Sequence, residues 1–141
     1  MRDLQATAEA LLADLVGFPS VTGTPNGAIV GYIKDYLEEL NIPVSIDAHE
    51  DGERFNLFAS IGPQIDDGIV LSGHTDVVPA NSAGWAGDPF TLHEQDGRLY
   101  GRGAVDMKGF LAIALALAPV FKKAENELRL PLHCAFTFDE E

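Results

Sequence analysis

The stretch IVLSGHTDVVP, residues 69–79, decides the class of fold. It begins with the unbroken apolar run 69–71, which is typical of a strand buried on both faces in an α/β sheet. The run leads directly into His74 and Asp76. Because ligands of α/β proteins bind at the carboxyl ends of strands, the sequence predicts a functional site here.

A second polar cluster follows the last predicted strand. Residues 130–138 form another apolar run, which ends in Asp139, Glu140 and Glu141. Between the two runs lies a long apolar helix that we expect to begin at about Met107 or Lys108 and to be kinked or ended by Pro119. Strand, crossover helix and strand together predict an α/β fold with a mixed, partly parallel sheet flanked by helices.

The remaining elements are predicted from their spacing. Apolar residues at helical intervals indicate one helix before Pro19 and a second that begins at Thr24-Pro25, as N-cap and first helical residue. Short β-type runs cover 42–46 and 55–61. Asp96-Gly97 predicts a hairpin turn between 90–92 and 98–100.

Composition excludes several classes of function. The chain has 141 residues, of which 46% are hydrophobic, enough to form a core. Its formal net charge of −13 argues against nucleic acid and anionic membranes as partners. The longest apolar run, 110–121, is shorter than the roughly 20 residues of a membrane span. With one cysteine, Cys134, and no visible signal peptide, the sequence predicts a soluble, cytoplasmic protein.

Taken one by one, the polar residues allow two interpretations. His74 is either a metal ligand, oriented by Asp76, or part of a surface turn. Asp106 is a ligand, the N-cap of the apolar helix, or both, since one carboxylate oxygen can cap the helix while the other faces a metal. Glu140 and Glu141 are either a solvated turn or a pair that divides the roles of ligand and base. Cys134 is expected to pack in the core, and Trp85 either walls a pocket or packs under its loop. A phosphate loop at 101–109 is rejected because Lys108 precedes Gly109 and Asp106 repels phosphate.

The combination of motifs is more specific than any single residue. SGHTDVVP (72–79), GRGAVDMKG (101–109) and TFDEE (137–141) occur in this order. This arrangement resembles the M20 family of co-catalytic zinc amidohydrolases and peptidases, over essentially the whole chain.

The resemblance implies a role for each polar residue. His74 would bind one zinc ion, Asp106 would bridge two, and Glu141 would bind the other. Glu140 would be the general acid/base of amide hydrolysis, and Asp76 would orient His74. The implied cofactor is Zn²⁺ at two sites, with Co²⁺ as a substitute. The peptide bond between Asp106 and Met107 is expected to be cis, as is common in the family.

Within the family, the sequence of residues 84–92 and 96–110 is most similar to that of the acetylornithine deacetylase branch. The implied reaction is deacetylation of N-acetylornithine to ornithine in arginine biosynthesis, with an N-acylated amino acid as the small-molecule partner. Succinyl-diaminopimelate desuccinylase, aminoacylase and dipeptidase specificities stay open. The alternative from another class is a non-catalytic interaction fragment.

Members of the family are longer than this chain. Two more metal ligands, an aspartate and a histidine, and a lid domain that often dimerises lie beyond the equivalent of Glu141. Residues 1–141 are therefore expected to be the N-terminal part of the catalytic domain, inactive alone and part of a homodimer at full length. The sheet is expected to expose an apolar edge or face.

Overall fold

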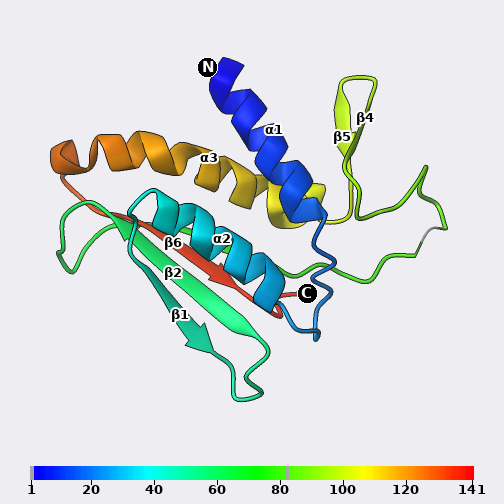
Figure 1. The fold of residues 1–141 in the computed structure, drawn as a ribbon, viewed down its shortest axis with the longest axis horizontal. Helices are drawn as coiled ribbons and strands as arrows, with labels where there is room; N and C mark the ends of the chain where they lie inside the picture. The colour runs from blue at the N-terminus through cyan, green and yellow to red at the C-terminus, as the bar shows by residue number, and fades with distance from the viewer. Residues whose placement is uncertain (1, 82) are drawn as a thin grey trace.

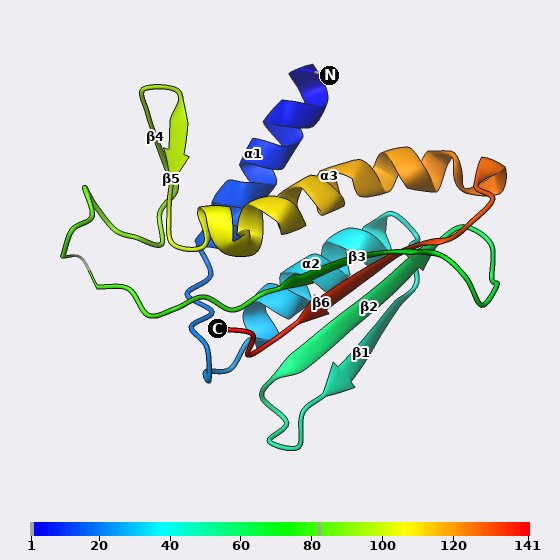
Figure 2. The same cartoon turned by 180° about the vertical axis from the view of Figure 1, so that it is seen from behind.

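The computed structural model describes residues 2–81 and 83–141. The described residues form a main β-sheet with helices packed beside it (Figures 1 and 2). The helices are α1 (Arg2–Val16), α2 (Gly27–Glu39) and α3 (Gly109–Lys123). The strands of the main sheet are β1 (Val44–Ala48), β2 (Phe55–Ile61), β3 (Ile69–His74) and β6 (Leu132–Thr137). β4 (His93–Gln95) and β5 (Arg98–Tyr100) form a separate hairpin, and short turns cover Ala104–Lys108 and Glu125–Glu127. The hairpin has the predicted turn and second strand, but its first strand is His93–Gln95 and not the predicted 90–92, because His93 is the residue that pairs with Tyr100.

The main sheet has the order β1-β2-β6-β3. β1 and β2 are antiparallel, as are β2 and β6, whereas β3 and β6 are parallel. The chain crosses from β3 to β6 through α3, as the sequence predicts. The register pairs His74 with Thr137. The polar clusters that follow β3 and β6 therefore begin side by side, at the carboxyl ends of these two parallel strands (Figure 2).

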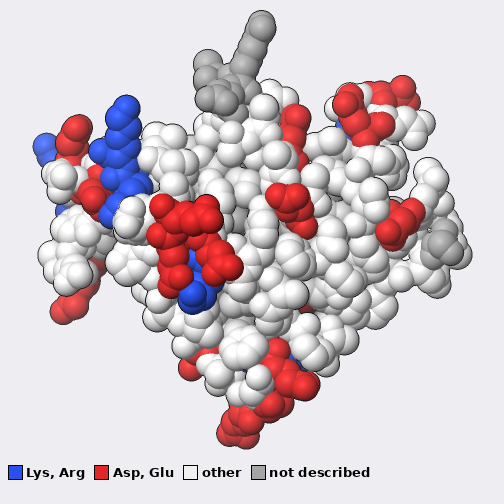
Figure 3. Space-filling model, in the orientation of Figure 1, with Lys and Arg blue, Asp and Glu red and all other residues white. Residues whose placement is uncertain are grey.

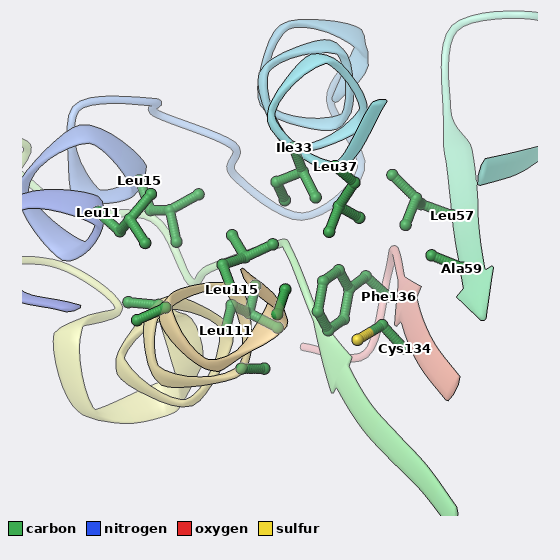
Figure 4. Close-up of a cluster of buried hydrophobic side chains, with 14 of the residues drawn as sticks. Leu11, Leu15, Ile33, Leu37, Leu57, Ala59, Leu111, Leu115, Cys134 and Phe136 are labelled. Carbon is green, nitrogen blue, oxygen red and sulfur yellow. The ribbon is translucent and has the colours of Figure 1, made fainter. Parts of the chain in front are cut away.

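The core lies between one face of the sheet and the helices (Figure 4). Ile33 and Leu37 of α2 and Leu115 of α3 point toward Leu57 and Phe136 of the sheet, and all five are fully buried. Strand side chains alternate between the two faces, so Phe58 points away from the helices and is 42% exposed. Among the described residues, α2 and α3 therefore lie on one face of the sheet, and α1 packs against α3. Cys134 packs in this core, as predicted, and burial raises the pKa of its thiol to about 11.

The prediction that both faces of β3 are buried is wrong. Ile69 is 57% and Val70 54% exposed. The reason is topological, because β3 pairs only with β6 among the described residues and so forms an edge of the sheet. These side chains form the exposed apolar edge that the sequence led us to expect.

The second helix begins later than predicted, at Gly27 instead of Pro25. Asn26 precedes it, but its side chain makes no cap hydrogen bond to the helix. Its amide pairs with the backbone of Phe55, donating to the carbonyl at 2.9 Å and accepting from the N–H at 2.8 Å. This long-range pairing with the start of β2 replaces the local cap.

Pro119 does not end α3, which continues to Lys123. A proline deprives the carbonyl four residues earlier of its helical donor, and here the Tyr36 hydroxyl donates to the Leu115 carbonyl at 3.3 Å. The stretch Ala104–Lys123 has the length and apolar composition of a membrane span. Within this stretch Leu111 and Leu115 are fully buried in the core, whereas Ile113 and Val120 are each 55% exposed.

The acidic residues on the face drawn in Figure 3 form several separate groups over different elements. Lys and Arg side chains on this face lie mainly beside those acids. This distribution is typical of a solvated surface that mixes both signs of charge. The net charge of −13 is therefore not gathered into one patch on this face.

Candidate metal centre

Three of the predicted site residues meet at the carboxyl edge of the sheet. His74 is the last residue of β3, Asp106 lies in the turn before α3, and Glu141 follows β6. One candidate ligand atom from each lies within 4.8 Å of the others. An imidazole nitrogen and two carboxylates form a donor set that Zn²⁺ binds. The structure thus brings together the three residues proposed as ligands, which are far apart in sequence.

The His74 ring is held in one orientation. Its side chain is buried, and Nδ1 lies 3.0 Å from the backbone carbonyl of Asp76. Since a carbonyl only accepts hydrogen bonds, Nδ1 carries a proton. Nε2 lies 3.1 Å from Oδ1 of Asp106, so it is the nitrogen that faces the carboxylates. Once Nε2 gives up its own proton, the ring is in the tautomer that a metal-binding histidine requires.

Asp76 connects two parts of the centre. Its Oδ1 lies 3.4 Å from Nδ1 of His74, so the orienting contact predicted from the sequence is made more closely by the backbone carbonyl than by the carboxylate. Its Oδ2 accepts a hydrogen bond from the backbone N–H of Glu141 at 3.1 Å. Asp76 Oδ1 is buried without a hydrogen-bond donor among the described residues. A buried, unneutralised carboxylate is costly, and a nearby cation would offset that cost.

Asp106 is presented by an irregular turn. The turn Ala104–Lys108 follows Gly103, whose φ of +80° favours glycine, and Asp106 itself has non-helical φ and ψ of −122° and 97°. The peptide bond between Asp106 and Met107 is cis, as the resemblance implied. Lys108 precedes α3 as its N-cap residue, without a side-chain cap bond. The side chain of Asp106 is 74% exposed and faces His74, so the N-cap interpretation is wrong.

The glutamate pair lies beyond the last hydrogen-bonded residue of β6, Thr137. Asp139, with φ of +53°, turns the chain before the pair. Glu140 places Oε2 3.6 Å from Nε2 of His74, and its side chain is 63% exposed. The proposed base and the proposed ligand Glu141 therefore both lie at His74, because the strand has ended and its alternation of faces no longer applies.

The same acids act on the pKa of His74. Burial lowers this pKa, but hydrogen bonds to Asp106 and to the Asp76 backbone, with the charges of Asp76 and Glu140, raise it above its ordinary value overall. Metal and proton compete for Nε2. We therefore expect the Co²⁺ affinity of the chain to fall about tenfold per pH unit below this pKa. A titration with Co²⁺ at several pH values measures this loss of affinity.

The Asp76→Asn variant provides the matched comparison for that experiment. It removes one charge that raises the pKa and keeps the backbone hydrogen bond to the ring. The onset of the loss of affinity should move to lower pH. An onset that is the same in both proteins would contradict the electrostatic explanation.

Lys108 is a buried residue of the site that the sequence analysis did not assign. Its side chain is 0% exposed, and Nζ donates to the backbone carbonyl of Phe18 at 2.6 Å. It thereby ties the turn that carries Asp106 to the loop after α1. Burial lowers the pKa of Lys108 from 10.5 to about 8. The sequence feature that could have indicated this role is the position of a lysine at the start of an apolar helix.

This lowered pKa makes folding depend on pH. Between pH 8 and 10.5 the unfolded chain binds the proton that folded Lys108 has lost, so the free energy of unfolding rises with pH across this window. The shift corresponds to a rise of about 3 kcal/mol. Urea unfolding at both pH values should show the rise in the wild type and not in Lys108→Met. The raised pKa values of Tyr32 and Tyr36 act equally in both proteins and cancel in the difference. Equal rises in both would contradict this assignment.

A cavity of about 520 Å³ opens beside the centre. Asp106 and Glu141 line it, together with Trp85 and Arg102. The Arg102 guanidinium lies over the Trp85 ring, 5.3 Å from its centroid. Trp85 is thus a pocket wall, the first of the two roles proposed from the sequence. The cavity gives a small molecule access to the proposed ligands.

Comparison with known proteins agrees with this geometry. Residues 70–141 match peptidase family M20/M25/M40. Acetylornithine deacetylase of Proteus mirabilis (strain HI4320) is 37% identical over 139 residues, covering 93% of this chain and 35% of that protein. The same enzyme of Shigella sonnei (strain Ss046) is 37% identical over 135 residues, covering 90% and 34%. The chain thus spans about a third of the length of these relatives.

The fold is also similar to solved structures. An M20 family metallo-carboxypeptidase from Sulfolobus solfataricus superposes with a TM-score of 0.80 at 23% identity, over 94% of this chain and 31% of that one. Human carnosine dipeptidase 1 gives 0.75 at 24% identity, over 96% and 33%. At such identities the likeness concerns the fold alone. The match of residues 70–141, which carry all three motifs, decides the assignment: the chain belongs to peptidase family M20/M25/M40.

Proposed function

We propose that this chain carries the metal-binding part of a zinc-dependent amide hydrolase. The observation that carries the proposal is the convergence of His74, Asp106 and Glu141 within 4.8 Å at one edge of the sheet. We propose that residues 1–141 form the N-terminal part of the catalytic domain. The further ligands and the lid domain would lie in the rest of the protein, and the chain alone would be inactive.

In this proposal each residue has a distinct task. His74, Asp106 and Glu141 would hold the zinc, at two sites, with Co²⁺ as a substitute. The metal supplies polarisation of the amide carbonyl and a lowered pKa for the attacking water. Glu140 accepts the proton of that water at Oε2 and returns it to the nitrogen of the leaving amine. Asp76 holds a proton at Nδ1 of His74, so that Nε2 would be the nitrogen that binds the metal.

The proposed reaction is deacetylation of N-acetylornithine to ornithine in arginine biosynthesis. The names of two relatives at 37% identity support it. The cavity beside the centre supports an N-acylated amino acid as the small-molecule substrate. We further propose that the protein works in the cytoplasm as a homodimer, without nucleic acid or membrane partners.

The substrate is tested by comparing N-acetylornithine with N-succinyl-diaminopimelate in the protein that carries this chain. The proposal predicts a higher kcat/KM for N-acetylornithine and dependence of both reactions on added Zn²⁺ or Co²⁺. A preference for the succinylated substrate would replace the deacetylase proposal with the desuccinylase. No hydrolysis of either compound, or of dipeptides, would favour a non-catalytic role.

A further inference from the structure

The segment that carries Glu140 and Glu141 is held in place by contacts away from the metal centre. Asp139 precedes the pair in the left-handed region, with φ of +53°. This conformation is uncommon for a residue other than glycine, so surrounding contacts must stabilise it. Asp139 Oδ1 accepts a hydrogen bond from the backbone N–H of Gly23 at 2.9 Å. Its Oδ2 pairs with the guanidinium of Arg54.

Arg54 comes from a different part of the chain, the turn between β1 and β2. Its Nε donates to Oδ2 of Asp51 at 2.6 Å, and its guanidinium lies over the Phe138 ring, 5.4 Å from the centroid. His49 packs edge-on against the same ring at 5.5 Å. The guanidinium is therefore fixed by two carboxylates and one aromatic face, and the Arg54 side chain is 20% exposed.

These contacts continue into the centre through the backbone. The N–H of Glu141 donates to Asp76 Oδ2 at 3.1 Å, and the Thr22 hydroxyl donates to the Glu141 carbonyl at 3.3 Å. Asp139 and Arg54 touch neither His74 nor Asp106 in any hydrogen bond or ion pair of the described residues. Any influence on the metal ligands must pass through the conformation of residues 139–141.

We propose that Arg54 and Asp139 are positioning residues, which fix the turn from which Glu140 and Glu141 reach the metal centre. This inference rests on the proposed function of the two glutamates. The aromatic face and the two carboxylates suit a planar guanidinium, which forms two directed hydrogen bonds at once where a lysine ammonium is a point charge. The side chains of Arg54 and Asp139 are 20% and 29% exposed, so the geometry of the pair is better defined than that of a fully exposed ion pair.

The test uses the full chain, with Arg54→Gln, Arg54→Lys, Asp139→Asn and the double variant Arg54→Gln/Asp139→Asn. Arg98→Gln, an exposed residue of β5, is the matched control for loss of one positive charge. Two readouts are made on each protein. Co²⁺ titration gives metal affinity, and NMR order parameters of the Glu140 and Glu141 amides in the metal-free chain give the rigidity of the turn.

We expect Arg54→Gln and Asp139→Asn each to weaken Co²⁺ binding about 10–100-fold, the usual effect of removing an outer contact of a metal site. The double variant should be no weaker than the weaker single variant, because both remove the same interaction. Arg54→Lys should recover part of the loss. The order parameters of both glutamates should fall from about 0.85 toward 0.6 in Arg54→Gln, and Arg98→Gln should match the wild type in both readouts.

Unchanged order parameters or unchanged Co²⁺ affinity in Arg54→Gln would overturn the inference, as would an equal loss in Arg98→Gln. If Arg54→Gln does not fold, Asp139→Asn decides by the same criteria. If even the full-length protein that carries this chain binds no Co²⁺, the proposed function fails instead, and the order parameters alone then decide whether the two residues fix the turn.

Discussion

Glu140→Gln is expected to lower kcat about 10²–10⁴-fold while metal binding stays within about threefold of the wild type. The carboxylate lies 3.6 Å from Nε2 of His74 and is 63% exposed, so it can meet a substrate in the cavity without supporting the core. Glutamine has nearly the same shape but cannot take up the proton of the attacking water. The measurement is kcat for N-acetylornithine hydrolysis in the protein that carries this chain, with the Co²⁺ affinity determined in parallel.

Glu94→Gln is the control for that variant, because Glu94 is an exposed glutamate on β4. It should keep full activity. A Glu140→Gln protein with activity within tenfold of the wild type would show that another group moves the proton. A parallel loss of metal would show that Glu140 is a ligand and not the base.

Asp106→Ala is expected to have the largest effect on metal binding, a loss of more than about 100-fold, since even outer contacts of metal sites are worth 10–100-fold. Its Oδ1 lies 3.1 Å from Nε2 of His74, at the centre of the three candidate ligands. Its side chain is 74% exposed and makes no cap hydrogen bond to α3. We therefore expect the free energy of unfolding without metal to change by no more than about 0.5 kcal/mol.

The two readouts for Asp106→Ala are Co²⁺ titration and urea unfolding of the metal-free chain. Asp66→Ala, an exposed residue of the loop before β3, is the matched control and should leave both unchanged. If Asp106→Ala binds Co²⁺ as tightly as Asp66→Ala, then Asp106 is not a ligand. A large loss of stability would instead assign it to the fold.

The parts of this fold that the sequence predicted are those that depend on local pattern. The run 55–61 alternates buried and exposed residues and forms β2 over the same residues. Asp96-Gly97 forms the hairpin turn, with positive φ at both positions. The candidate ligands were found because each follows a strand or precedes a helix within a recognisable motif.

Several of the errors and omissions involve contacts between distant residues. The exposure of Val70 depends on which strand lies beside β3, and the start of α2 depends on the pairing of Asn26 with Phe55. The link from Lys108 to the Phe18 carbonyl joins residues 90 positions apart, and that from Arg54 to Asp139 joins residues 85 apart. No local sequence pattern predicts contacts between residues so far apart in the chain.

The central claim is that His74, Asp106 and Glu141 bind the same metal centre. Anomalous X-ray diffraction from crystals of the chain grown with zinc, measured on both sides of the zinc absorption edge, tests it most directly. The account predicts anomalous density between the three side chains, with metal about 2.0–2.2 Å from His74 Nε2 and from the carboxylate oxygens. Zinc density elsewhere on the chain, with none in contact with His74, would contradict it.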